Sequence, residues 1–254
     1  MGNIINSMLE EIKKAGKPYV FRYRQDNIFT LEEIKDSYIY FQKRELLNDP
    51  FDSTPDLVDL KYISIDNLYK AFEKLVGKQK TEFIVKKLSQ KRVEETIRHS
   101  IPRFINKHGI ACFSMLPGVN MPLLANYTNN HKGLYLQYNI DLDLDFFSGL
   151  KLMNYQKELK KISIELLENE EDIYKIFFLK QENWSYEQEL RLVNEEFGKY
   201  YLKREALRNI ICGYNCSEEY IEKVLESNKL NKHVNVWKME KPTVHNRLKL
   251  DLIG

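Results

Sequence analysis

Hydrophobic patterns of two different periods interleave along this chain, and their order limits the folds that it can adopt. Strand-like patterns occupy residues 19–24, 37–41, 109–114, 133–140, 150–155, 208–213, 233–238 and 246–252. Apolar residues at helical spacing occupy residues 3–15, 66–107, 157–180 and 217–229. Because the two patterns are mixed without regular alternation, they predict an α+β fold with a mixed sheet core.

The length and the local signals favour one domain. A chain of 254 residues is long enough to bury a sizeable core. We predict a single domain over residues 1–254, in which 66–107 form a helical insertion broken near Gly77. Thr30-Leu31-Glu32-Glu33 has the pattern of a capping box at the start of a short helix.

The composition is ordinary for a soluble globular protein, with 43% hydrophobic residues, 30% charged residues and a net charge of +2. Such a small net charge gives no strong overall field, so a preference for polyanions requires a local patch. The sequence shows neither a secretory signal nor an apolar run that could span a membrane. Cys112, Cys212 and Cys216 form no paired framework, which favours structural thiols and a cytoplasmic location.

One segment departs from this charge balance. Between Lys70 and Lys107, Lys and Arg outnumber Glu by eleven to four. A basic helix face can follow a phosphate backbone, so the segment is a candidate nucleic-acid contact, although a solvated helix face is the more ordinary explanation of the charges. The residues concerned are Lys86, Lys87, Lys91 and Arg98, with Arg92 and Arg103 nearby.

The tract from Trp184 to Val193 carries two carboxylates one residue apart, Glu187 and Glu189. In an extended chain both side chains project from the same side. Like charges so close raise each other's pKa unless a cation, a metal or a hydroxyl network lies between them. With Trp184 and Tyr186 beside them, the carboxylates indicate a ligand-holding cleft, whereas pairing with Arg191 or nearby lysines is the purely structural explanation.

Five short motifs follow one another in a recognisable order. They are Arg22-Tyr23-Arg24, Asn48-Asp49-Pro50-Phe51-Asp52, Cys112-Phe113-Ser114, His131-Lys132-Gly133 and the pattern Trp184-x-x-Glu187-x-Glu189-x-Arg191. The series resembles a bacterial domain-of-unknown-function family associated with abortive infection and phage defence, over roughly residues 19 to 240. Members carry a Met-Trp-Ser-His-Tyr-like segment where this chain has Leu123-Leu124-Ala125-Asn126-Tyr127, so the aromatic and the histidine of that motif are absent.

The order of an arginine, a serine and a Glu-x-Glu pair is also similar to the arginine–serine–glutamate class of mono-ADP-ribosyltransferases. This resemblance implies an ADP-ribosyltransferase-like core, NAD as a substrate, and a toxin-like effector that modifies a protein or nucleic acid. It implies that Arg22 or Arg24 binds an NAD phosphate. Ser114 would support the strand on the nicotinamide side, and Glu189 would bind the nicotinamide ribose. Glu187 then orients or deprotonates the acceptor, and the residues expected to line the NAD site further are Tyr127, His131, Trp184 and Tyr186.

The chemistry explains why these residue types suit that reaction. Cleavage of the nicotinamide–ribose bond passes through an oxocarbenium-like state, which a carboxylate beside the ribose stabilises. A planar guanidinium binds a pyrophosphate in a bidentate way.

Two other hypotheses stay open at this stage. A metal-dependent nuclease would hold magnesium with Glu187, Glu189 and either Asp49 or Asp52, although both aspartates also suit a turn. A non-catalytic module would use the same pocket to sense a nucleotide or a phage component. An antitoxin or another defence protein is a conceivable partner, and no metal is assigned to the leading hypothesis.

Overall fold

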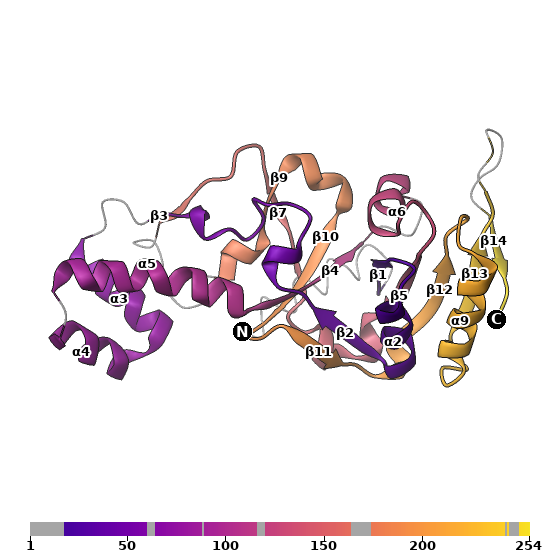
Figure 1. Cartoon of the computed structure of the whole chain (residues 1–254), viewed down its shortest axis with the longest axis horizontal. Helices are drawn as coiled ribbons and strands as arrows, with labels where there is room; N and C mark the ends of the chain where they lie inside the picture. Colours follow the sequence, from indigo (N-terminus) through magenta and orange to yellow (C-terminus); the bar gives the residue numbers. More distant parts are fainter. Residues whose placement is uncertain are drawn as a thin grey trace.

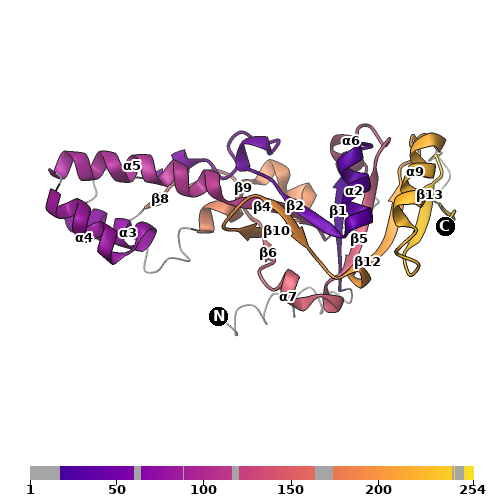
Figure 2. The same ribbon diagram turned by 60° about the horizontal axis from the view of Figure 1, so that its bottom comes forward.

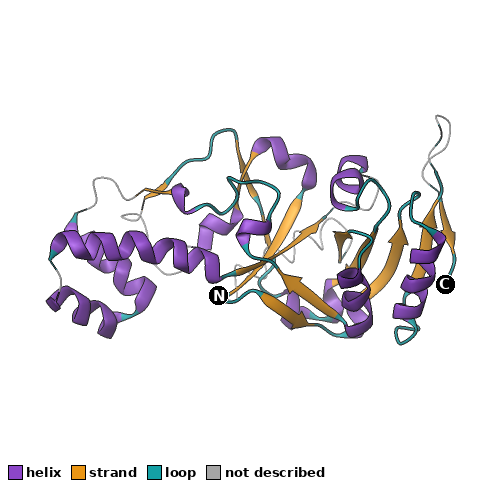
Figure 3. Ribbon diagram, viewed as in Figure 1, coloured by secondary structure: helices purple, strands orange, loops and turns teal. Residues whose placement is uncertain are grey.

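The computed structural model describes residues 18–59, 64–87, 89–115, 120–163, 174–241, 243 and 249–254. The helix predicted over residues 3–15 lies outside this part of the chain. Figure 1 and Figure 3 show a sheet in the centre of the molecule and a group of helices that projects from one end.

The main sheet has eight strands in the order β14-β13-β12-β5-β1-β4-β10-β6. Neighbouring strands are antiparallel except for the parallel pair β12 and β13. The strands are β1 (Tyr19–Arg24), β4 (Gly109–Ser114), β5 (Leu134–Asn139), β6 (Lys151–Leu152), β10 (Glu189–Asn194), β12 (Leu207–Cys212), β13 (Asn235–Met239) and β14 (Leu250–Leu252). An α+β architecture with a mixed sheet is therefore confirmed.

This sheet is weakly joined in the middle. Six registered pairs connect β1 to β5, and six connect β4 to β10. Between β1 and β4 a single pair is registered, Phe21 with Ser114. The sheet therefore consists of two well-paired halves that separate beyond that point.

Helices cover both faces of the half that contains β1. On one face, α2 (Ile28–Asp36) packs against α9 (Glu218–Asn228), and Ile34 and Val224 are fully buried in the largest core cluster. On the other face, Leu124 of α6 (Met121–Tyr127) joins a smaller cluster with Phe21. Alternate residues of β1 face opposite sides because strand side chains repeat with period two.

The start of α2 corrects one sequence prediction. Asn27 is the cap, and its side chain accepts a hydrogen bond from the backbone N–H of Thr30. Thr30 instead donates its hydroxyl to the carbonyl of Gln25. Glu33 does not reach back to the cap, because it is buried between two arginines of β1.

Three helices occupy the segment expected to be helical: α3 (Ile65–Val76), α4 (Lys78–Lys87) and α5 (Gln90–Lys107). The first break falls at Gly77, whose φ of 86° suits glycine. Figure 1 and Figure 2 agree that these helices extend away from the sheet as an arm. A second core cluster, which includes Phe72, Val93 and Ile110, joins the arm to the sheet.

The helix predicted over residues 157–180 is wrong in the part that the structure describes. This part contains β8 (Ile162–Ser163), a 3₁₀ helix η5 (Lys175–Phe178) and β9 (Leu179–Gln181). Strand β9 pairs in parallel with β7 (Asn154–Gln156). Ile176 and Phe177 are buried in the second core cluster, so their helical spacing reflects tertiary packing and not one long helix.

The remaining elements are short. Strand β2 (Tyr38–Phe41) pairs with β11 (Gly198–Tyr201), and β3 (Val58–Asp59) pairs with β8. The other short elements are α7 (Leu144–Phe147) and the 3₁₀ helices η1 (Arg44–Leu46), η2 (Pro55–Leu57), η3 (Ile140–Leu142), η6 (Glu182–Glu187) and η7 (Arg204–Ala206). None of the described helices combines the length and apolar character needed to cross a bilayer.

Candidate functional site

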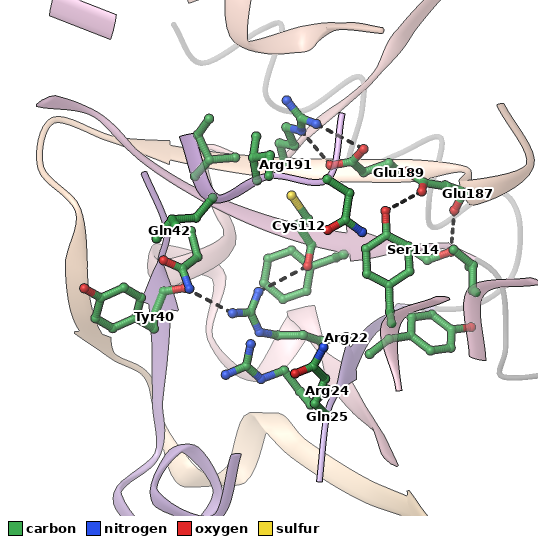
Figure 4. Close-up of a pocket in the computed structure, with 18 of the residues that line it drawn as sticks. Arg22, Arg24, Gln25, Tyr40, Gln42, Cys112, Ser114, Glu187, Glu189 and Arg191 are labelled. Atoms are coloured by element: carbon green, nitrogen blue, oxygen red, sulfur yellow. Dashed lines mark hydrogen bonds and ion pairs between the residues drawn. The ribbon is translucent and has the colours of Figure 1, made fainter. Parts of the chain in front are cut away.

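A cavity of about 740 Å³ opens where the two halves of the sheet separate. Its wall comes from β1, α2, β2, β4, α6, β9, η6, β10 and β11 and from the segment that follows β2. The volume lies within the ~300–1,000 Å³ typical of small-molecule sites. Figure 4 shows side chains from both halves of the sheet gathered around it.

Six of the predicted site residues line this cavity although they are far apart in sequence: Arg22, Arg24, Ser114, Tyr127, Glu187 and Glu189. The other three lie outside the lining. His131 stacks on Tyr214, with 4.5 Å between ring centroids, in a turn where its φ is 66°. Trp184 and Tyr186 lie on η6, with the Trp184 ring 5.0 Å from the Nζ of Lys180.

The two glutamates meet by a route that the sequence pattern did not predict. Glu187 ends the 3₁₀ helix η6, Gln188 adopts a left-handed conformation with φ of 41°, and Glu189 begins β10. The tract is therefore not continuously extended. Both carboxylates nevertheless turn toward Lys180, whose Nζ lies 2.5 Å from Oε2 of Glu187 and 2.7 Å from Oε2 of Glu189.

Arg191 continues this ionic network into the protein. Its Nε donates to Oε1 of Glu189 at 2.6 Å, and its Nη1 donates to Oδ1 of Asp52 at 2.7 Å. Its Nη2 also bonds Asp52. Arg191 is only 1% exposed, and its Nη1 also bonds the carbonyl of Phe177 at 2.9 Å. Asp52 is therefore an ion-pair partner in the structure.

The two carboxyl groups differ in pKa because their surroundings differ. Burial alone would raise the pKa of Glu189, but Arg191 and Lys180 outweigh burial and lower that pKa to about 2. For Glu187 burial prevails, and the neighbouring Glu189 adds to it, so the pKa is raised in spite of Lys180. The sequence left open whether a cation, a metal or a hydroxyl network lies between the two carboxylates. In the structure this position is taken by the cation Lys180.

Further hydrogen bonds fix the turn that carries the glutamates. The hydroxyl of Ser114 donates to the carbonyl oxygen of Glu187 at 2.7 Å, and Tyr127 donates its hydroxyl to Oε1 of Glu187 at 2.5 Å (Figure 4). The backbone N–H of Glu189 donates to the hydroxyl oxygen of Tyr155 at 2.9 Å. Ser114 and Glu189 also lie opposite each other in the pairing of β4 with β10.

The arginines of β1 share one face, as their spacing predicts, and both approach Glu33. Nε of Arg22 donates to Oε1 of Glu33 at 2.9 Å, while Nη1 and Nη2 donate to the carbonyls of Cys112 and Tyr40 (Figure 4). Nε of Arg24 lies 2.8 Å from Oε2 of Glu33, an ion pair without hydrogen-bond alignment. No described residue bonds the Nη atoms of Arg24, so Arg24 is the arginine that can bind an anion.

Lys180, Glu33 and Tyr155 are site residues that the sequence did not reveal. Lys180 lay inside a segment with helical spacing, and Glu33 fitted a capping box. Lys180 and Glu33 contact residues 7 to 11 positions away across a change of secondary structure. Tyr155 contacts Glu189, which lies 34 positions away. The spacing of apolar residues within one helix or strand gives no signal for such contacts.

The basic residues of the helical segment and the cysteines Cys212 and Cys216 lie outside the cavity lining. Lys86 and Lys87 end α4, whereas Lys91 and Arg98 belong to α5, so they do not form one face of a single helix. All four are exposed. Cys212 and Cys216 are buried free thiols, and the described residues contain no group of three or more His, Cys, Asp or Glu that could hold a metal.

Together, the fold and the site define a mixed α+β protein with an ionic small-molecule cavity at a break in its sheet. No protein-family model, no curated protein and no solved structure matches this chain. The defence-associated family and the ADP-ribosyltransferase-like core therefore stay predictions from its motifs.

Proposed function

We propose that this chain is an ADP-ribosyltransferase-like enzyme that binds NAD in the cavity and breaks its nicotinamide–ribose bond. ADP-ribose then passes to a macromolecular acceptor, or to water in the absence of one. One observation carries the proposal: Arg24, Ser114 and the Glu187–Glu189 pair come from separate segments and line a single cavity.

The phosphate end of the ligand is assigned to Arg24. Its Nη atoms have no bonding partner among the described residues, and a guanidinium binds phosphate oxygens in a bidentate way. Arg22 is a positioning residue, since its hydrogen bonds to Glu33, Cys112 and Tyr40 hold β1 beside β2 and β4.

The reacting end is assigned to the two glutamates. When the bond between C1′ and the nicotinamide nitrogen breaks, its electron pair leaves with nicotinamide and the ribose becomes positively charged. Glu189 stays ionised over the whole physiological range, so its negative potential favours that state. Glu187 keeps a pKa above the ordinary value and suits acceptance of the proton from the attacking hydroxyl as the new bond to C1′ forms.

The ionic network argues against the metal-dependent nuclease. Asp52 is bound through both oxygens by Arg191, and Lys180 bonds Glu187 and Glu189. A magnesium ion would have to displace these two cationic side chains to gain three carboxylates. The sensing module uses the same cavity and differs only in the absence of turnover.

Release of labelled nicotinamide from NAD tests the proposal. We expect release by the parent protein and a loss of at least about 100-fold in Glu189→Gln, by analogy with the removal of one preorganised electrostatic group. Glu182→Gln is the matched control, because Glu182 is exposed in the same 3₁₀ helix. Melting curves verify that each variant is folded.

Two results would contradict the proposal. A folded Glu189→Gln protein as active as the parent removes the assigned chemistry. A parent protein that NAD stabilises against heat but does not cleave is a sensing module, since a ligand that binds the native state must raise the melting temperature.

A further inference from the structure

Asp49 in the cavity wall has a buried carboxylate oxygen without a hydrogen-bond partner among the described residues. Asp49 is 5% exposed and lines the cavity, and no described residue donates to its Oδ2. The ionic network described above does not include this side chain. A buried polar oxygen left without a donor is costly, so a ligand in the cavity that donates a hydrogen bond to Asp49 relieves that cost.

The orientation of Asp49 is fixed by its own turn. Its Oδ1 accepts the backbone N–H of Phe51 at 2.9 Å, and its carbonyl accepts the N–H of Asp52 at 3.1 Å. These bonds account for the turn that the sequence predicted at this position. They leave Oδ2 unused, so the turn alone does not explain why a carboxylate lies here.

The charges nearby restrict what Oδ2 can bind. Asp52 in the same turn is paired with Arg191, and Lys180 lies 4.0 Å from Asp52. Both cations are already bound by Asp52, Glu187 and Glu189, and the described residues include no group of ligands around Asp49 that could hold a metal ion. The carboxylate of Asp49 itself opposes an anion. A neutral hydroxyl donor meets neither obstacle. Elsewhere in the cavity wall lies Arg24, whose Nη atoms have no bonding partner among the described residues and suit a phosphate.

We propose that Asp49 is a ligand-binding residue whose Oδ2 accepts a hydrogen bond from a ribose hydroxyl of a phosphorylated ligand. This inference rests on the proposed function and adds the group that recognises the sugar. It also separates two roles: Arg24 contributes affinity for phosphate, and Asp49 contributes selectivity for a sugar that carries free hydroxyls.

Calorimetric titration with two probes tests this assignment. ADP-ribose carries phosphates and ribose hydroxyls, whereas inorganic pyrophosphate carries phosphates alone. In Asp49→Asn we expect the Kd for ADP-ribose to rise about tenfold or more, because a charge-assisted hydrogen bond is lost. Pyrophosphate should bind the variant at least as tightly as the parent, since a negative charge has been removed.

Asp49→Asn is a conservative change because the amide oxygen can still accept the N–H of Phe51. Asp56→Asn is the matched control, since Asp56 is exposed in the following 3₁₀ helix and does not line the cavity. Without ligand, Asp49→Asn should melt at the same temperature as the parent or higher, because an unpaired buried charge is gone. A structural role would instead lower the melting temperature.

The inference is overturned if ADP-ribose does not bind the parent, if it binds Asp49→Asn equally well, or if the variant melts lower and loses both probes together. Because ADP-ribose contains no nicotinamide, its binding does not depend on cleavage. Asp49-dependent binding without nicotinamide release would remove only the proposed function. Nicotinamide release with binding that ignores Asp49 would remove only this inference.

Discussion

At the scale of single residues, the position of Arg191 makes two chemically identical side chains different. Glu187 and Glu189 both bond the Nζ of Lys180, but Glu189 also bonds Arg191. Among the described residues, the further side-chain donor to the Glu187 carboxylate is the hydroxyl of Tyr127. Arg191 therefore decides which carboxyl stays ionised. The consequence is a pair in which one group holds a fixed charge and the other can exchange a proton.

This difference predicts opposite pH dependences of stability for two variants. The pKa of Glu189 is lowered on folding, so the ionised group stabilises the fold above its ordinary pKa, and this stability is lost as the pH falls toward 2. The melting deficit of Glu189→Gln relative to the parent should therefore shrink between pH 7 and pH 4. The pKa of Glu187 is raised, so its protonation stabilises the parent as the pH falls. The melting temperature of Glu187→Gln relative to the parent should therefore drop over the same interval.

Melting curves at several pH values between 7 and 4 measure both slopes. Glu182→Gln again serves as the control and should follow the parent at every pH, since Glu182 is exposed. If the melting temperatures of both variants, relative to the parent, change in the same direction with pH, the two carboxyl groups do not have opposite pKa shifts.

At the scale of secondary-structure elements, the sequence predicted correctly those elements whose buried face follows from the apolar pattern within the element itself. The alternation in β1 and β4 and the helical stripe in α9 gave these elements to within about one residue. It failed over the described parts of the predicted helix, 157–163 and 174–180, where Ile176 and Phe177 are spaced as in a helix but pack into the second core cluster.

The same limit applies to the site. Six lining residues could be found because they belong to short motifs, and Arg24 and Glu189 are examples. Lys180 and Glu33 could not, since each acquires its role from a strand that reaches it only in the folded chain. For Glu33 a plausible local role in a capping box concealed the nonlocal one.

The helical arm carries a prediction about the acceptor. If the acceptor is a nucleic acid, the triple variant Lys87→Gln, Lys91→Gln, Arg98→Gln should bind single-stranded DNA or RNA more weakly, and the slope of log K against log salt should fall by about 2–3. A filter-binding series over several salt concentrations measures both. Removing three exposed lysines in and after α9, Lys223, Lys229 and Lys232, is the control of equal charge. Equal losses in the two triple variants would indicate a general charge effect and not a site on the arm.

At the scale of the whole molecule, the break in the sheet connects the fold to the proposed function. The half with β1 supplies Arg24, and the half with β4 and β10 supplies Ser114 and Glu189, yet Phe21 and Ser114 form the one registered pair between these strands. A ligand that reaches both ends of the cavity adds contacts between the halves where the backbone provides few. Binding and the cohesion of the two halves are therefore expected to be coupled.

Hydrogen exchange of backbone amides measures this coupling directly. ADP-ribose should slow exchange in β1 and in the first residues of β10 together, because it would contact Arg24 in one half and the carboxylates in the other. Inorganic pyrophosphate, which has no sugar to extend toward the carboxylates, should slow exchange mainly in β1. In Arg24→Gln the protection by ADP-ribose should weaken in both halves, since a ligand released from one half no longer bridges them. Lys35→Gln, a change at an exposed residue near the end of α2, should leave the pattern unaltered. Protection by ADP-ribose that stays confined to one half would show that the ligand does not span the break, and the cavity would then lose its role as the link between the two halves.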